Sequence, residues 1–132
     1  MATVSRDKLK QKGLKRFVKS FSFALEGLKY AFKYEQNILA HTLATILVIS
    51  LGFVFHISYT EWLIIFLIIG LVIATELINT SIEAVVDLIT KEKNPLAKVA
   101  KDTAAAAVMV FALIAVVLGL MIFVPKIIEI FL

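Results

Sequence analysis

The chain has 132 residues, 61% of them hydrophobic, with a formal net charge of +4 and a mean hydropathy of +0.95. A soluble globular domain is typically about 45–50% apolar, so one small core could not hide this much apolar sequence from water, and we expect lipid around it. The absence of cysteine excludes disulfides, thiolate metal sites and cysteine nucleophiles. The length leaves room for one domain, residues 1–132.

Residues 14–34 predict an amphipathic helix. Apolar side chains recur every three or four positions, which is the spacing of one helix face: Leu14, Phe17, Phe21, Leu25, Leu28 and Phe32. Lysines follow the same rhythm on the opposite face. We expect the helix to lie on a membrane surface, with its aromatic rings at the acyl boundary and its lysines toward anionic headgroups. The alternative is a soluble amphipathic helix that packs on protein.

Three further segments predict membrane-crossing helices, over residues 37–56, 61–90 and 96–125. Pro95 suits the first turn of the last helix, and Pro125 marks the far end of that span. Because the first long apolar run begins near Asn37, we expect no cleaved signal peptide. The predicted class is an all-α integral membrane protein with three transmembrane helices, plus an N-terminal amphipathic surface helix.

The basic residues predict the orientation. With three spans, the N-terminal segment and the 91–101 segment lie on the same side of the membrane, and all lysines and arginines except Lys126 are found there. The positive-inside rule makes that side cytoplasmic. We therefore expect a multi-pass membrane protein, with its N-terminus in the cytoplasm and its C-terminus outside.

The second span carries polar side chains that gain nothing from lipid. Glu76, Asn79, Glu83 and Asp87 are spaced so that they share one helix face. An ionisable residue at the centre of a span costs about 2.5–3.5 kcal/mol on insertion scales. At about 1.5 Å per residue, Glu76 lies about 21 Å from Trp62, within the inner half of the bilayer. Catalysis would explain this placement, and hydrogen bonding between helices is the alternative.

Other polar residues reach the same layer. Lys101 and Asp102 lie near the start of the third span, Glu35 precedes the first span, and His41 follows one or two turns inside it. Carboxylates for Mg²⁺, a lysine for phosphate and a semi-buried carboxylate for proton abstraction are the groups that phosphoryl transfer needs. The structural alternatives are a helix-start pair for Lys101 and Asp102, a solvated residue for Glu35, and packing for His41. No Walker-type loop or nucleic-acid motif is present, and we expect no nucleic-acid partner.

The polar block is also specific as a motif. The pattern E-x-x-N-x-x-x-E-x-x-x-D at 76–87, followed by A-K-D at 100–102, resembles the signature of the prokaryotic diacylglycerol kinase family. Gly27 and the pattern E-x-N-x-x-x-H at 35–41 are similar to its Gram-positive undecaprenol kinase branch. The resemblance covers about residues 15–124. It implies a homotrimer that uses ATP and Mg²⁺, with active sites shared between neighbouring subunits near the cytoplasmic face.

The resemblance also implies roles for single residues. Glu76 is expected to be the general base that takes the proton of the lipid hydroxyl. Asn79 would position groups near the γ-phosphate, and Glu35 and Glu83 would hold the metal that bridges the ATP phosphates. The residues implied for ATP binding are Arg16, Glu35, Glu83, Asp87, Lys101 and Asp102.

The sequence therefore predicts an ATP-dependent lipid kinase that phosphorylates a membrane lipid alcohol. Undecaprenol, giving undecaprenyl phosphate, is the expected acceptor, and diacylglycerol, giving phosphatidic acid, is the alternative. A competing class is a small oligomer that conducts protons or cations along the carboxylate stripe. Because Leu63 to Ala74 carry no charge, the stripe stops halfway across the membrane, which favours the enzyme.

Overall fold

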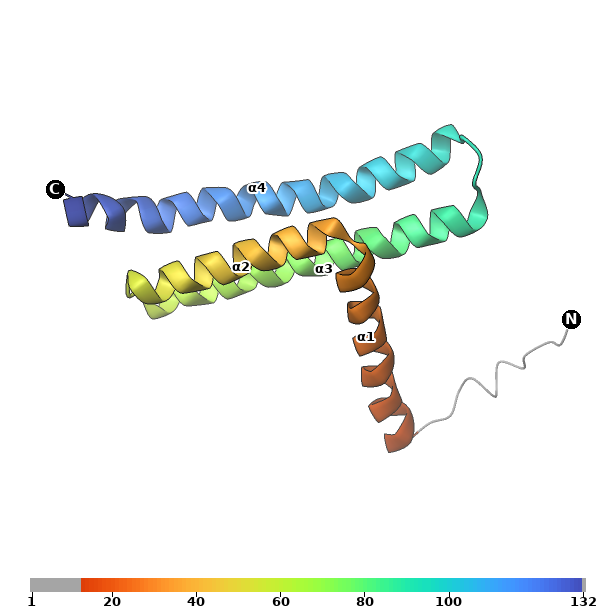
Figure 1. The fold of residues 1–132 in the computed structure, drawn as a ribbon, viewed down its shortest axis with the longest axis horizontal. Helices are drawn as coiled ribbons and strands as arrows, with labels where there is room; N and C mark the ends of the chain where they lie inside the picture. Colours follow the sequence, from red (N-terminus) through yellow and green to blue (C-terminus); the bar gives the residue numbers. More distant parts are fainter. Residues whose placement is uncertain (1–12, 132) are drawn as a thin grey trace, which may run out of the picture. The chain divides into compact units, whose positions relative to one another are not determined.

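The computed structural model describes residues 13–131, without the side chains of Lys15 and Phe131. Helices α1 (Leu14–Tyr34), α2 (Gln36–Val54), α3 (Tyr59–Ile89) and α4 (Pro95–Phe131) follow one another along the chain (Figure 1). No strand occurs within this described range, and the predicted all-α class is confirmed. The described residues form two compact units. Helix α1 belongs to the first, which ends at Tyr34, and the other three helices belong to the second, which begins at Glu35.

The first unit is the helix that the apolar spacing predicts. Gly13 precedes it with a φ of +134°, a backbone conformation that glycine adopts without a steric penalty. Along the helix, the Phe17 and Phe21 rings meet edge to face, with centroids 5.1 Å apart. Its large apolar side chains are exposed, except for Leu28, which is partly buried. Its place on a membrane surface stays a prediction.

The second unit is a bundle of three helices that are each long and apolar enough to cross a membrane. A crossing needs about 20 residues, and α2 has 19, α3 has 31 and α4 has 37. Helices α3 and α4 run antiparallel and make the main packing contact, with α2 beside α3 (Figure 1). We call the end with residues 55–58 the turn end and the end with residues 90–94 the loop end.

The turn end is closed by tight backbone geometry. The His56 N–H donates to the Phe53 carbonyl and the Ile57 N–H donates to the Gly52 carbonyl, the pattern of a Schellman C-cap. His56 supplies the left-handed residue, with φ 47°. On the other side of the turn, the Ser58 hydroxyl accepts from the Glu61 N–H at 3.3 Å. The Glu61 carboxylate accepts from the Ser58 N–H at 2.6 Å, which completes a capping box.

Apolar packing is concentrated at this end. Ile57, Ile65, Ile122 and Phe123 are buried together, and partly buried side chains surround them: Val48, Leu51, Phe55, Trp62 and Ile69. The approach of α2 to α3 is so close that a Cβ added to Gly52 would lie 2.7 Å from Trp62 Cη2. Any larger residue at this contact would force the Trp62 ring to shift.

Within residues 13–131, two ion pairs join α3 to α4. Lys126 Nζ lies 3.3 Å from Glu61 Oε2 at the turn end, and Lys101 Nζ lies 2.6 Å from Asp87 Oδ1 at the loop end. Helix α4 runs through Pro125 to Phe131, so this proline does not end the helix. The end of the third span at Pro125 stays a prediction. Proline is tolerated in membrane helices where neighbouring groups stabilise the backbone, and the Lys126–Glu61 pair fixes the next residue.

Candidate active site

One face of α3 is buried along the bundle and changes from apolar to polar toward the loop end. Its buried residues are Ile65, Ile68, Val72, Glu76, Asn79 and Thr80. Their spacing of mostly three or four positions is that of one helix stripe, so the polar residues continue the line of the apolar ones. Ala104 and Val108 are the buried residues of facing α4 near this level, and the small alanine lets the helices approach closely. The fold therefore encloses Glu76 and Asn79, the part of the carboxylate stripe that is predicted to lie deepest in the membrane.

Glu76 is the most enclosed ionisable group of the described chain. The residue is 1% exposed, and both of its carboxylate oxygens lack a hydrogen-bond partner among the described residues. Asn79 Oδ1 and Thr80 Oγ1 are buried and unpaired in the same way. Buried polar atoms in folded proteins almost always have partners, so three such residues on one stripe need a functional explanation. The alternative that Glu76 bonds to a neighbouring helix finds no support within the described part of one chain.

One turn further toward the loop end, two polar side chains of this stripe are hydrogen-bonded to each other. The Asn79 side-chain amide donates to Glu83 Oε1 at 3.1 Å, which orients the amide and leaves the Glu83 Oε2 atom for another partner. Glu83 is partly exposed. The pair sits between the enclosed Glu76 carboxylate and the solvated loop end, where a charged ligand is cheaper to hold.

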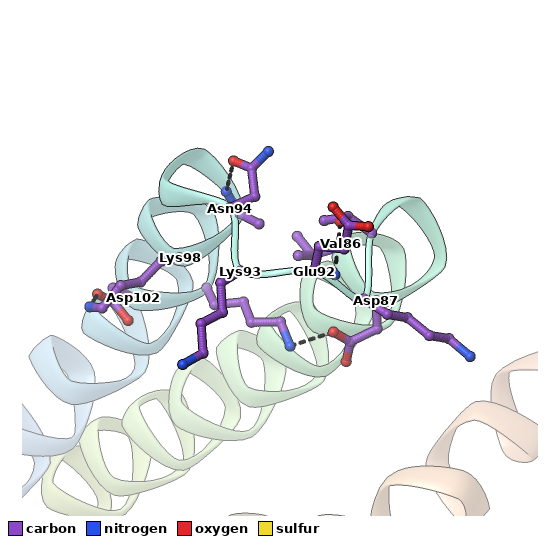
Figure 2. A pocket seen from close by; sticks show the side chains of 11 residues that line it. Val86, Asp87, Glu92, Lys93, Asn94, Lys98 and Asp102 are labelled. Carbon is purple, nitrogen blue, oxygen red and sulfur yellow. Dashed lines mark hydrogen bonds and ion pairs between the residues drawn. The ribbon is translucent and has the colours of Figure 1, made fainter.

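The loop end contains a cavity of about 320 Å³ between the last turn of α3, the loop and the first turns of α4 (Figure 2). Asp87, Lys98, Lys101 and Asp102 all line it. Asp87 accepts from Lys101 across the two helices, and Asp102 accepts from Lys98 within α4. Lysines and acidic residues thus line one hollow together, a setting that suits an anionic ligand.

Local sequence fixes this cavity. The Asn94 side chain accepts from the Leu96 N–H at 2.8 Å and from the Ala97 N–H at 3.3 Å, so it caps the start of α4. Pro95 occupies the first helical position, where its missing N–H costs no hydrogen bond. The Thr90 hydroxyl accepts from the Glu92 N–H at 3.1 Å and shapes the other side of the loop. These turns bring Lys101 back to Asp87 and place Lys98 in the lining of the same cavity.

The donor set fits a magnesium ion only when substrate oxygens are added. Within residues 13–131, no three histidine, aspartate or glutamate side chains gather closely enough to hold a metal. Mg²⁺ is usually held by one or two carboxylates together with substrate phosphates and water. Glu83, with one oxygen not used by Asn79, fits that role.

The structure unites part of the predicted site. Asn79 with Glu83, and Asp87 with Lys101 and Asp102, are brought together by contacts or by a shared cavity. Glu35 is the N-cap residue of α2, its side chain makes no capping bond, and no ion pair joins it to the described site residues. Arg16 lies exposed on α1, in the other unit.

An apolar groove of about 610 Å³ runs along α2, α3 and α4. Alanines and Gly119 on α2 and α4 make room for it, and His41 and Val72 line it. Because Val72 precedes Glu76 by one turn on the same buried stripe, the groove leads toward the Glu76 carboxylate. His41 thus contributes to the wall of a groove, and a metal role for it finds no support among the described residues.

Sequence reasoning missed two residues. Thr80 is buried with an unpaired hydroxyl, and its position four residues after Glu76 was the available signal. Lys98 lines the cavity and pairs with Asp102. Its position three residues before Lys101 places both lysines on one face of α4.

Three helices that are long and apolar enough to cross a membrane, with a buried polar cluster on one of them, define an integral membrane protein. The family model described as prokaryotic diacylglycerol kinase matches residues 22–123. The chain is 50% identical over 113 residues to the undecaprenol kinase of Bacillus subtilis strain 168, covering 86% of this chain and 92% of that protein. The chain belongs to the prokaryotic diacylglycerol kinase family, and it is a lipid kinase.

Two diacylglycerol kinases are also similar. That of a Synechocystis species is 39% identical over 101 residues, which cover 76% of this chain and 58% of that protein. That of Pseudomonas aeruginosa is 34% identical over 97 residues, which cover 74% of this chain and 79% of that protein. The family predicted from the motif is therefore confirmed, and the comparisons favour the enzyme over the conducting oligomer.

Proposed function

We propose that this lipid kinase transfers the γ-phosphate of ATP to undecaprenol and releases ADP and undecaprenyl phosphate. The acceptor is proposed because the chain is 50% identical to a protein named undecaprenol kinase. Diacylglycerol is the second candidate, since two similar proteins at 34–39% identity are named diacylglycerol kinase. Both acceptors present one primary hydroxyl at the level of the membrane interface.

The observation that carries the proposal is the buried Glu76 carboxylate, whose two oxygens have no partner among the described residues. A base must reach the proton that it abstracts within hydrogen-bond distance, and an oxygen without a partner is free to accept from a lipid hydroxyl. As the hydroxyl oxygen bonds to the γ-phosphorus, its proton passes to Glu76. The bond from that phosphorus to the bridging oxygen breaks, and ADP leaves.

The neighbouring residues would hold the phosphates. Lys101, oriented by Asp87 at 2.6 Å, supplies positive charge at the loop end, and Asn79 positions groups near the γ-phosphate. Glu83 and Glu35 would hold Mg²⁺. When bound, magnesium neutralises charge on the phosphate oxygens during a loose transition state. Asp102 and Arg16 complete the proposed ATP site.

The apolar groove would take the hydrocarbon chain of the acceptor. It is lined almost entirely by aliphatic and small side chains, and one end approaches the level of Glu76. A chain lying there would present its terminal hydroxyl to the carboxylate while the ATP enters from the loop end. Such positioning of two reactants converts a bimolecular step into an effectively unimolecular one.

We also propose a homotrimer in the bacterial cell membrane, with the loop end and N-terminus in the cytoplasm and the C-terminus outside. The excess of lysine and arginine in the N-terminal and 91–101 segments supports the orientation. Glu35 and Glu83 are not joined within the described part of one chain. That separation is expected where a neighbouring subunit contributes to each site.

The test is transfer of label from ATP carrying ³²P at its γ-phosphate, with purified protein in mixed micelles. Undecaprenol and diacylglycerol are offered at equal mole fraction, each alone and in competition. We expect label on undecaprenol, a higher kcat/KM for it than for diacylglycerol, and loss of transfer on chelation of Mg²⁺. Preferred labelling of diacylglycerol would reverse the choice of acceptor, and absence of label on both would refute the proposed reaction.

A further inference from the structure

The cavity at the loop end is lined by three lysines that neither the motif nor the proposed reaction uses: Lys91 and Lys93 on the loop, and Lys98 on α4 beside the predicted Lys101. Lys98 lines the same cavity as Lys101, three residues earlier on α4. Positions three and four apart on a helix are neighbours, so Lys98, Lys101 and Asp102 share one face. Figure 2 shows Lys98 and Asp102 on the α4 side of the hollow and Asp87 on the α3 side.

Each of the two lysines is held by one aspartate. Lys101 binds Asp87 of α3 and Lys98 binds Asp102 of its own helix. An ammonium has three donors and no acceptor, so one carboxylate leaves two donors on each lysine for a ligand. The carboxylates fix the direction of the side chains without saturating them.

The exposure of the two pairs differs. The side chain of Lys101 is 36% exposed, whereas that of Lys98 is 76% exposed. An exposed ion pair contributes about 0–1 kcal/mol, so the Lys98–Asp102 pair adds little to stability and leaves Lys98 accessible to an anion. Lys98 also lies about 4.5 Å further from the membrane centre along α4 than Lys101.

We propose that Lys98 is a second phosphate-binding residue, which together with Lys101 forms a two-lysine clamp on the phosphate chain of the nucleotide. The inference rests on the proposed kinase reaction. Lys101 faces the terminal phosphates, nearer to Glu76, and Lys98 faces the phosphates nearer to the nucleoside. Asp87 and Asp102 are positioning residues for these two lysines. Lysine binds phosphate as a point charge, and two such charges in a row match a polyphosphate.

The test compares Lys98→Gln and Lys98→Arg with Lys126→Gln. Lys126 is a matched control because it is also an α4 lysine paired with a carboxylate, but it lies at the turn end. For each variant, the KM for MgATP, the kcat, the KM for undecaprenol and the inhibition constants of ADP and adenosine are measured.

For Lys98→Gln, we expect the KM for MgATP and the inhibition constant of ADP to rise about three- to tenfold, because one solvent-exposed contact between a charged side chain and a phosphate is lost. The kcat, the KM for undecaprenol and the inhibition constant of adenosine should change less than about twofold, because Lys98 lies away from the transferred phosphate. Lys98→Arg should retain most of the affinity, and Lys126→Gln all of it. Added salt should weaken ATP binding less in Lys98→Gln than in the parent.

Three results would overturn the clamp. Unchanged constants for MgATP and ADP would make Lys98 a solvated residue. Equal weakening of adenosine and ADP would mean that Lys98 only holds Asp102 in place. A change confined to micelles with anionic lipid would mean that Lys98 binds lipid headgroups. ADP binding measured by calorimetry tests the clamp even if the purified protein transfers no phosphate, a result that would refute the proposed function alone.

Discussion

The two ends of the three-helix unit are built differently. At the turn end, Ile57, Ile65, Ile122 and Phe123 are buried together, and the chain reverses through a Schellman cap and a capping box. At the loop end, the buried residues of α3 become polar, and charged side chains surround a cavity. Well-packed apolar side chains stabilise a fold, whereas unpaired buried oxygens destabilise it. Apolar packing at the turn end therefore compensates for the destabilising effect of the unpaired polar groups toward the loop end.

The strongest test of this division removes the charge of Glu76. Glu76→Gln keeps the size of the side chain but removes the proposed base, and general base catalysis contributes about 10²–10⁴-fold. We expect kcat for phosphate transfer to fall by that factor, with unchanged thermal unfolding and oligomer size. Glu129→Gln, an exposed acid near the C-terminus, is the control and should be fully active. Undiminished turnover in Glu76→Gln would exclude the carboxylate as the base.

The second test breaks the turn end and leaves the loop end alone. In Gly52→Ala, the new methyl group would lie 2.7 Å from Trp62 Cη2 and 3.1 Å from Ile57 Cδ1. Overpacking of this kind typically costs about 1–3 kcal/mol. We expect a lower unfolding temperature in detergent, with a near-normal KM for ATP below that temperature. Gly70→Ala, where nothing lies within 4 Å of the added Cβ, should unfold like the parent. Equal effects of the two substitutions would contradict the close contact.

The third test concerns the boundary between the two ends. Glu83→Gln retains an oxygen for the Asn79 amide, which donates at 3.1 Å, but removes the charge proposed to hold magnesium. We expect the Mg²⁺ concentration for half-maximal activity to rise about tenfold, which corresponds to roughly 1.4 kcal/mol. Glu129→Gln, an exposed acid away from the loop end, is the comparison variant. A magnesium titration identical to that of the parent would count against Glu83 as a metal ligand.

The smallest effect is expected from the ion pair at the turn end. The Lys126 and Glu61 side chains are each about one-quarter exposed and lie 3.3 Å apart. Lys126→Gln should lower the free energy of unfolding by about 0–1 kcal/mol and leave the kinetic constants unchanged. Denaturation in detergent measures the first, and the label-transfer assay measures the second. A change in the KM for ATP would show that the ends are coupled.

Spacing along the sequence predicted what depends on a single helix. The apolar period located the helices, and the offsets of Glu76, Asn79 and Glu83 placed them on one face, where the structure finds the Asn79–Glu83 bond. Contacts between helices depend on the rotation of α3 against α4, which spacing does not fix. The pairing of Asp87 with Lys101 and the enclosure of Thr80 therefore emerged only from the fold.

The end of α4 shows the same limit. Proline removes a backbone donor and usually interrupts a helix, so Pro125 reads as a boundary in the sequence. In the structure, Lys126 directly after it pairs with Glu61, a residue more than sixty positions earlier. Local propensity could not anticipate a contact between such distant residues. The roles of Glu35 and Arg16 stay predictions for the related reason that they depend on neighbouring parts of an assembly.

The two ion pairs between α3 and α4 also define the length of helix that lies between charged residues. Twenty-six positions separate Glu61 from Asp87, and twenty-five separate Lys101 from Lys126, which is about 38 Å along each helix. This exceeds the hydrocarbon thickness of about 30 Å and approaches that of the whole bilayer. Strong tilting would draw a charged pair into the acyl chains, which is costly. Lipids with shorter or longer tails would therefore shift the depth at which Glu76 meets an acceptor, so turnover should depend on hydrophobic mismatch.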